Sequence, residues 1–95
     1  MTVGSCKIEL RIPDSGSLKD KRRIVKSLKD RVWARFNVGI AEVDRLNDWH
    51  RATLGIAAVS NDARVVDEVL SKVVNWIEAN GEVLVVDYEI DLVTH

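Results

Sequence analysis

The chain has 95 residues, enough for one domain and near the small end of sizes that bury a hydrophobic core without disulfides or metals. It is 46% hydrophobic and 31% charged, as ordinary soluble globular proteins are, and its net charge of −1 points to no partner by itself. No apolar run approaches the ~20 residues that cross a bilayer, and the N-terminus lacks the features of a secretory signal. The single cysteine, Cys6, excludes an intrachain disulfide and suits a reducing compartment. We therefore expect one cytoplasmic domain over residues 1–95, with no membrane association.

Three elements are predicted in the first half of the chain. Apolar and polar residues alternate over 6–12, as in a strand with one buried face. Ser17 is a suitable N-cap, with Asp20 three residues on, and apolar residues recur at helical spacing over 18–36. This spacing predicts a helix of about five turns. Residues 37–44 form a second strand, whose alternation slips and so indicates a bulge or an irregular edge.

Three further elements are predicted in the second half. Residues 52–60 form a third strand with small, apolar side chains on both faces. A second helix follows, capped by one of residues 60–62 and closed at Asn80-Gly81. The last strand is expected to point Leu84, Val86, Tyr88, Ile90 and Leu92 to one face and Asp87, Glu89 and Asp91 to the other.

The order β-α-β-β-α-β predicts an α+β, ferredoxin-like βαββαβ sandwich. Crossovers within one sheet are right-handed, and the commonest arrangement then places two helices on one face of a four-stranded antiparallel sheet. In that topology the fourth strand lies beside the first. Its acidic residues would face Lys7 and Arg11 across the open side of the sheet, where opposite charges favour the pairing.

Proteins of this fold have many unrelated functions, so function has to be inferred from specific residues. The residues required by two known functions of the fold are missing here. RNA-recognition motifs stack bases on aromatic residues of the first and third strands, and neither strand carries one here. The loop "IPDSGS" at 12–17 has one glycine and an acidic residue, a poor phosphate cradle for an acylphosphatase-like enzyme. We therefore predict no enzyme and no small-molecule substrate.

Two other parts of the sequence carry side chains that can take part in metal binding or nucleophilic chemistry. Asp44, Asp48 and His50 are near in sequence and could collect a divalent cation, but Asp is common in polar turns without any metal. Cys6 alternates inward with the apolar residues, and a buried thiol behaves as a small hydrophobic group rather than a nucleophile. We predict no metal site and no cofactor.

The first helix is the most unusual segment. Residues 17–36 hold eight of the fourteen Lys and Arg residues and only two acidic ones. On a helical wheel, part of this charge forms one stripe beside the buried seam, ending in a tryptophan. The cations of such a stripe can bind a phosphate backbone while the Trp33 ring stacks on a base. The alternative is structural: the aliphatic parts of Lys and Arg cover apolar surface beside the core, and Trp33 packs at the edge of the core. The candidate nucleic-acid-binding residues are Lys19, Arg22, Arg23, Lys26, Lys29 and Trp33.

Charge is also divided between the two halves of the chain. Residues 1–48 carry 11 basic and 7 acidic side chains, whereas residues 49–95 carry 3 and 8. Because the whole chain is nearly neutral, this division favours an anionic partner for the first half.

The chain resembles the YlxP-like proteins, a bacterial family of unknown function. The resemblance is carried by "SLKDKRRIVKSL" (17–28), "RFNVGIAEVD" (35–44), "DWHRATLGIAAVSND" (48–62) and "VVDYEID" (85–91). It implies a ferredoxin-like fold and a homodimer, and it brings no catalytic residues. Genes of this family often lie beside those of a transcription elongation factor, a translation initiation factor and a ribosome-binding factor, which implies a role near RNA or the ribosome.

Two functional hypotheses follow. The leading one is a non-enzymatic binding module that associates with RNA or the ribosome through residues 17–36. The alternative is a dimeric protein–protein interaction module whose protein partner docks on the same helix. In both we expect a homodimer, because helices cover one sheet face and small apolar residues such as Ala57, Val59, Val83 and Val85 are expected on the other.

Overall fold

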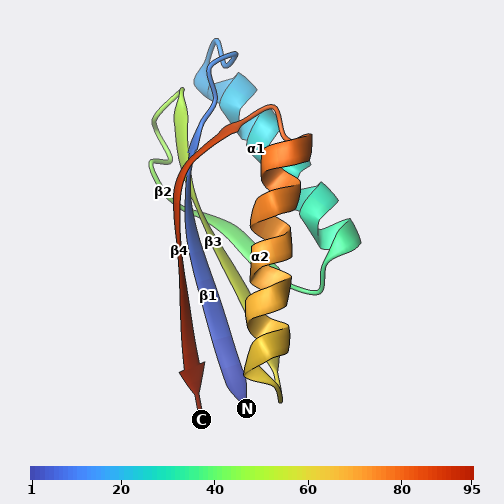
Figure 1. Ribbon diagram of the computed structural model, residues 1–95. Coiled ribbons are helices and arrows are strands. Elements are labelled where there is room, and N and C mark those ends of the chain that lie inside the picture. Colours follow the sequence, from blue (N-terminus) through green and yellow to red (C-terminus); the bar gives the residue numbers. More distant parts are fainter.

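Four strands form one antiparallel sheet in the computed structural model, which describes residues 1–95 (Figure 1). Their order across the sheet is β2-β3-β1-β4, so both crossovers pass over the helical face. This arrangement confirms the predicted ferredoxin-like α+β fold. The strands are β1 (Thr2–Arg11), β2 (Gly39–Asp44), β3 (Arg51–Ser60) and β4 (Leu84–Thr94).

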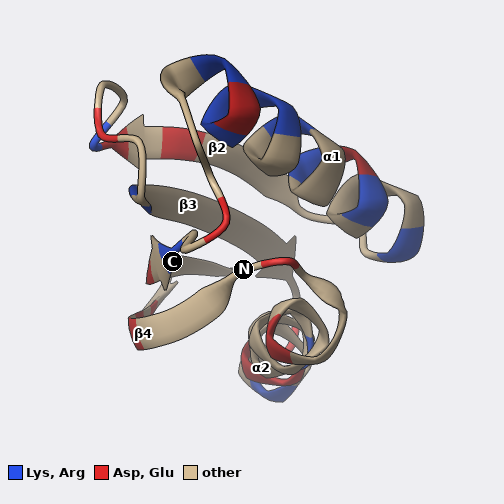
Figure 2. Ribbon diagram, turned by 90° about the horizontal axis from the view of Figure 1, so that it is seen from above, with Lys and Arg blue, Asp and Glu red and all other residues tan.

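Two helices of 18 residues, α1 (Leu18–Arg35) and α2 (Ala63–Asn80), lie on one face of the sheet (Figures 1 and 2). Helix α1 packs against β2, at one edge, and α2 packs against β1, β3 and β4. Neither helix is long and apolar enough to cross a membrane. The opposite face of the sheet has no covering element.

Local signals at the helix ends explain where each helix starts and stops. The Ser17 hydroxyl accepts a hydrogen bond from Asp20 N at 3.0 Å, as the sequence predicted. Of the three residues considered for α2, Asp62 is the cap, and its carboxylate accepts from Arg64 N at 2.9 Å. Gly81 follows α2 as expected, but with φ of −92° it does not adopt the left-handed conformation of a typical glycine cap.

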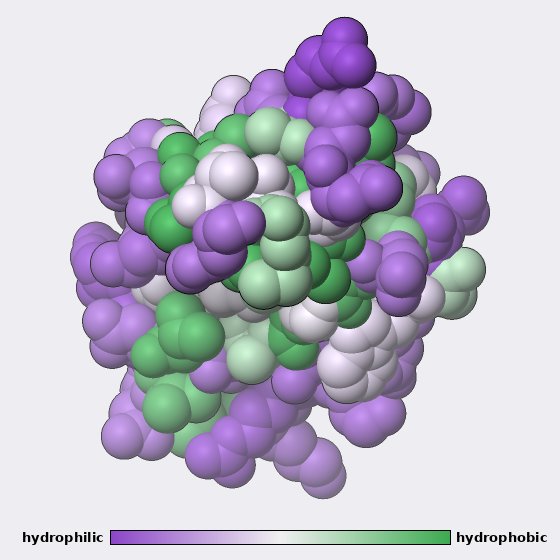
Figure 3. Space-filling view, turned by 90° about the horizontal axis from the view of Figure 1, so that it is seen from below, coloured by the Kyte–Doolittle hydropathy of each residue, from purple (hydrophilic) through white to green (hydrophobic).

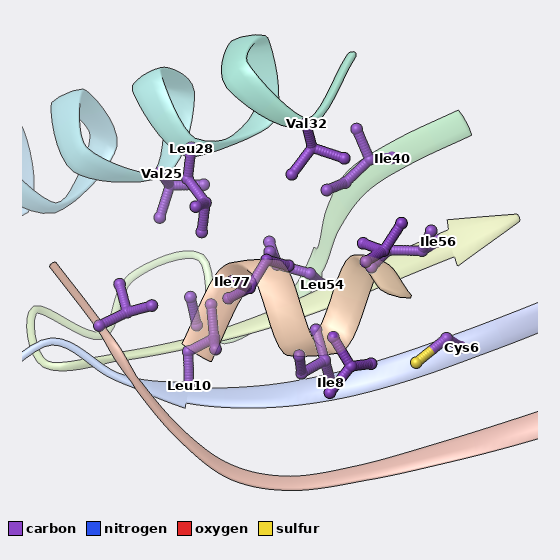
Figure 4. Packing of buried hydrophobic residues seen from close by; sticks show 14 of the residues in the cluster. Cys6, Ile8, Leu10, Val25, Leu28, Val32, Ile40, Leu54, Ile56 and Ile77 are labelled. Carbon is purple, nitrogen blue, oxygen red and sulfur yellow. The ribbon is translucent and has the colours of Figure 1, made fainter. Parts of the chain in front are cut away.

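A core of 19 buried hydrophobic residues fills the space between the sheet and both helices (Figure 4). Inward residues of β1 and β3 meet Val25, Leu28 and Val32 from α1 and Ile77 from α2. Gly4 is part of this contact, because a Cβ there would overlap the side chains of Val66 and Leu70 in α2. Helix α2 therefore packs unusually close to β1.

The alternation predicted for β4 is wrong at its start. The pairing of β1 with β4 shifts register between Glu9 and Leu10, which is a β-bulge. As a result Val85, rather than Val86, pairs beside buried Leu10, and Val86 is exposed. Val83 is buried, so it does not belong to the open face either.

The predicted cross-strand charge pairing holds for only one pair. Lys7 lies opposite Glu89, as expected. Arg11 instead lies opposite Leu84 on β4 and opposite Arg51 on β3. The bulge predicted in the second strand is confirmed, because the β2–β3 register shifts between Glu42 and Asp44.

The two termini meet at one end of the sheet. The Met1 ammonium donates to His95 O at 3.0 Å, and His95 N donates to Met1 O at 2.7 Å. Exposed Met1, Val59 and Val93 lie at this end, and Figure 3 shows apolar surface there among polar side chains. This end of the molecule therefore exposes apolar surface beside the open face.

Candidate nucleic-acid interface

The eight basic residues of α1 fall into three groups with different surroundings. One side chain is buried in an ion pair, two cover an aromatic ring on α2, and the rest face solvent. Figure 2 shows how strongly basic residues are concentrated on α1 compared with α2. Only the third group is free to meet a partner.

Lys21 is completely buried, with a side-chain exposure of 0%. Its ammonium group donates to Glu42 Oε2 at 2.7 Å and to the carbonyl oxygen of Arg45 at 2.8 Å. It also reaches the carbonyl oxygens of Leu46 and Arg51, each at 3.3 Å. All these acceptors belong to β2, β3 and the loop between them, so Lys21 fixes that loop to the start of α1.

Arg31 and Arg35 cover Trp76 of α2. Their guanidinium carbons lie 5.6 and 5.2 Å from the ring centroid, within the range of cation–π contacts. Arg31 also donates to Asn80 O at 3.0 Å. Both arginines therefore join the two helices.

The remaining basic residues of α1 are those that the sequence identified as candidates. Lys19, Arg22 and Arg23 are exposed and make no ion pair. Lys26 is exposed and pairs only with Asp30, one turn away on the same helix, at 2.9 Å. Such an exposed i,i+4 pair contributes about 0.3–0.5 kcal/mol and leaves the lysine able to exchange its partner. We define the basic stripe as Lys19, Arg22, Arg23, Lys26, Lys29 and Trp33.

Trp33 and Lys29 complete the basic stripe. Trp33 is 53% exposed, so it does not plug the core rim. Lys29 is half-buried beside it and has no ion-pair partner. Arg31, which faces α2, is about 160° from Trp33 around the helix, so the ring points away from α2.

The basic stripe thus runs along the side of α1 that faces away from α2. Helix α1 packs over β2, and β2 has a neighbouring strand on one side only. The stripe therefore flanks an open edge of the sheet. An extended polyanion could lie along α1 there without meeting the other helix.

Sequence reasoning missed the role of Lys21. The signal was present, because Lys21 lies three positions after Leu18 and seven before Leu28, on the apolar side of the wheel. A lysine at such a position is nearly always paired when buried. Its acceptors come from a distant strand and loop, which helical spacing cannot identify.

Asp44, Asp48, His50 and Cys6 do not come together in a metal or catalytic site. No group of three or more His, Cys, Asp or Glu side chains is placed to hold a metal ion. Asp48 Oδ1 accepts from His50 N at 2.9 Å. That backbone hydrogen bond, followed by the charges of Arg51 and Arg45, lowers the pKa of Asp48. Burial raises the pKa of the Cys6 thiol, which disfavours the nucleophilic thiolate.

Comparison with known proteins identifies the family. The sequence model of a family described as "Protein of unknown function (DUF503)" matches residues 3–90. The "Uncharacterized protein YlxP" of Bacillus subtilis (strain 168) is 37% identical over 81 residues, which cover 85% of this chain and 88% of that protein. A solved C-terminal segment of the alpha subunit of aIF2 from Pyrococcus abyssi has a TM-score of 0.48 and 18% identity. That match covers 99% of this chain and 51% of the other, so the chain spans about half of that segment. The chain belongs to the DUF503 family of unknown function, which confirms the YlxP-like resemblance of its motifs.

Proposed function

We propose that this chain is a non-enzymatic, cytoplasmic binding module that associates with RNA or the ribosome through the basic stripe of α1. The observation that carries the proposal is the exposure of Trp33 next to Lys29, which has no ion-pair partner. Exposed aromatic rings flanked by cations are the usual elements of a surface that binds single-stranded nucleic acid.

The charges of the basic stripe support this proposal because most of them have no partner within the domain. Lys21, Arg31 and Arg35 each have a structural partner, whereas Lys19, Arg22 and Arg23 have none. A set of unpaired cations on one helix side is electrostatically unfavourable in isolation and becomes favourable when phosphates neutralise it. Phosphate contacts of this kind carry no base information, so the binding should be largely independent of RNA sequence.

The test is the salt dependence of RNA binding. With three to five phosphate contacts, each adding about 0.7–0.9, the log–log slope of affinity against salt should be roughly −2 to −4. The variant Arg22→Glu/Lys26→Glu should flatten this slope and weaken binding evenly across single-stranded RNA sequences. Fluorescence anisotropy with labelled oligonucleotides measures both quantities.

The matched control reverses the only two basic residues of α2, Arg64 and Lys72. Each is exposed and paired with an acidic residue of the same element or its cap, as Lys26 is. The variant Arg64→Glu/Lys72→Glu makes the same change in net charge, so it should keep most of the slope. If the wild-type protein shows no RNA binding even at low salt, the proposal fails. Docking of a protein on α1 is then the remaining function for the stripe.

We also propose that the chain assembles as a homodimer through the part of the open sheet face that runs from Gly55 to Val59, away from the β2–β3 loop. A shallow apolar groove there is lined by small side chains, among them Gly39, Ala41, Gly55 and Ala57. It continues past Val59 towards the apolar end of the molecule. Surfaces of this kind are commonly covered by a second copy, and closed two-fold dimers are the commonest assembly. Light scattering at micromolar concentration that shows only an 11-kDa species would contradict this.

A further inference from the structure

Three arginines that are not among the predicted nucleic-acid-binding residues line one hollow on the open sheet face. The hollow has a volume of about 430 Å³, and Arg11, Arg45 and Arg51 lie around it with Glu9, Asp87 and Val86. These arginines come from the end of β1, the β2–β3 loop and the start of β3. None of them belongs to the basic stripe of α1.

The central feature of the hollow is a like-charge pair. Arg11 and Arg51 are directly opposite each other in the β1–β3 ladder. Ile12 N donates to His50 O at 2.8 Å, so Arg11 and Arg51 form a non-hydrogen-bonded pair, the type whose side chains approach most closely. Like charges directly opposite each other destabilise a sheet. Neither guanidinium is in an ion pair that would offset this repulsion.

The acidic residues that line the hollow have other partners. Glu9 Oε2 accepts from the buried Thr53 hydroxyl at 2.7 Å and from Arg45 Nε at 3.4 Å. Asp87 Oδ1 accepts from the backbone N of Tyr88 at 2.9 Å. Glu9 is thus held against Thr53 and paired with Arg45. Neither Arg11 nor Arg51 has an ion-pair partner, although the charge of Arg51 acts on the nearby Asp48 carboxylate and lowers its pKa. Three guanidinium groups against two carboxylates around the hollow leave a net positive charge for a ligand.

The backbone around the hollow is irregular in three places. Val86 lies at the bulge of β4, and Val43 lies at the bulge of β2, which leads into the loop. Arg45 has a φ of 59°, and it is the only non-glycine residue with a positive φ in the chain. Bulges and left-handed residues of this kind occur preferentially beside functional sites. Buried Lys21 holds this conformation through its hydrogen bond to Arg45 O at 2.8 Å.

We propose that this hollow binds a phosphate group between the guanidinium groups of Arg11 and Arg51, with Arg45 at its rim. Guanidinium groups match phosphate oxygens in geometry and form strong charge-assisted hydrogen bonds with them. A bound phosphate would also convert the repulsive Arg11–Arg51 pair into two attractive contacts. The identification of this phosphate as part of an RNA backbone rests on the proposed function; the binding of phosphate itself does not.

The hollow and the start of the basic stripe lie at the same end of the molecule. Lys21, in the first turns of α1, reaches the carbonyl oxygens of Arg45 and Arg51. The β2–β3 loop therefore separates the start of the stripe from the hollow. A single-stranded segment that follows α1 and crosses this loop would place a further phosphate between Arg11 and Arg51.

The experiment follows arginine Nε–H signals by NMR while inorganic pyrophosphate is added, with sodium chloride of equal ionic strength as the reference. We expect signals of Arg11 and Arg51 to shift with pyrophosphate and not with chloride. In Arg11→Gln or Arg51→Gln, pyrophosphate binding should weaken about tenfold or more, the loss expected for a charge-assisted hydrogen bond. The matched control is Lys7→Gln, which removes one positive charge from the same face of β1 outside the hollow. Lys7→Gln should change the affinity for pyrophosphate by about twofold or less, because solvent and salt screen the interaction between the Lys7 charge and a ligand in the hollow.

Thermal stability gives a second readout that does not depend on RNA. Without pyrophosphate, Arg11→Gln should keep or raise the melting temperature, since it removes the like-charge pair. With pyrophosphate, the wild type should gain stability by binding linkage and Arg11→Gln should not. If pyrophosphate leaves the Arg11 and Arg51 signals unchanged, or if Lys7→Gln weakens binding as much as Arg11→Gln, the inference is wrong.

A parallel titration with a short single-stranded RNA separates the two proposals. If RNA binds and depends on Arg22 and Lys26 but not on Arg11 or Arg51, the proposed function stands and the assignment of the hollow to an RNA phosphate is wrong. If RNA does not bind while pyrophosphate still shifts Arg11 and Arg51, the phosphate site stands with a free or terminal phosphate as its source. If both ligands bind and Arg11→Gln weakens both, the hollow is a backbone subsite of the RNA-binding surface.

Discussion

Lys21 and Arg22 are neighbours in α1, yet their surroundings have nothing in common. Lys21 is fully buried with its ammonium group within hydrogen-bond distance of four oxygen atoms, whereas Arg22 is exposed and has no ion-pair partner. A rotation of about 100° around the helix axis separates them. The comparison shows that a basic run in a sequence is not one surface. Some of the basic side chains in such a run stabilise the fold, and only the others are available to bind a partner.

The largest effect should come from removing the buried charge. Lys21→Met leaves the Glu42 carboxylate and three carbonyl oxygens without their donor. Breaking a buried ion pair on one side costs about 3–5 kcal/mol, and we expect a loss of unfolding free energy in that range. Urea denaturation followed by circular dichroism measures it.

Two further variants sharpen this prediction. Lys19→Met removes an exposed lysine from the same helix and should change stability by about 0.5 kcal/mol or less. Lys21→Met/Glu42→Leu removes both charges and should recover at least about 1 kcal/mol of the loss, because no buried charge is left unpaired. Equal stabilities for Lys21→Met and Lys19→Met would show that Lys21 has no structural role.

The difference between buried Lys21 and exposed Arg22 also shows how far the structure could be predicted from the sequence. Period-2 and period-3.6 patterns located all six elements, because burial of one face dictates those periods. Whether an inward-pointing lysine is tolerated depends on acceptors supplied by β2 and its loop, which are distant in sequence. The bulge at Val86 and the Arg11–Arg51 pair likewise depend on strand register, which no local pattern specifies. The exposed stripe was predictable because it needs only helical geometry.

The two tryptophans beside the basic residues of α1 give the next comparison. Trp76 is half-buried under Arg31 and Arg35, whereas Trp33 is 53% exposed. Trp76→Ala should cost about 2–3 kcal/mol, below the full loss for a core tryptophan because part of the ring is solvated. Thermal or urea unfolding of the variant gives this value.

Trp33→Ala is the matched substitution on the outer side of the helix. It should change stability by about 0.5 kcal/mol or less, but should weaken RNA binding by about 1–3 kcal/mol through loss of a base stack. A lower melting temperature with unchanged RNA affinity would mean that Trp33 supports the fold and is not part of the interface.

A smaller effect is expected from the single ion pair within the basic stripe. Lys26 and Asp30 are both exposed, with side-chain exposures of 76% and 51%. Lys26→Ala should therefore lower stability by about 0.3–0.5 kcal/mol, and Asp30→Ala by a similar amount, since either change removes the same i,i+4 pair. Chemical denaturation of the two single variants and the double variant gives the coupling energy. A coupling above about 1 kcal/mol would show that Lys26 is committed to this pair and not to a ligand.

The smallest effect on stability should come from Arg22, and it distinguishes a binding surface from a solvated helix face. Arg22→Gln keeps a long polar side chain with good helix propensity and removes a charge that has no partner, so the unfolding free energy should change by about 0.5 kcal/mol or less. If Arg22 contacts a phosphate, the same variant should reduce the salt slope of RNA binding by about 0.7–0.9. Arg64→Gln on α2 removes the same charge from the other helix and should leave the slope unchanged, because Arg64 is directed to its own cap at Asp62. Equal slopes for Arg22→Gln, Arg64→Gln and the wild type would show that Arg22 is solvated in the complex. The remaining cations of the stripe would then have to account for all of the binding.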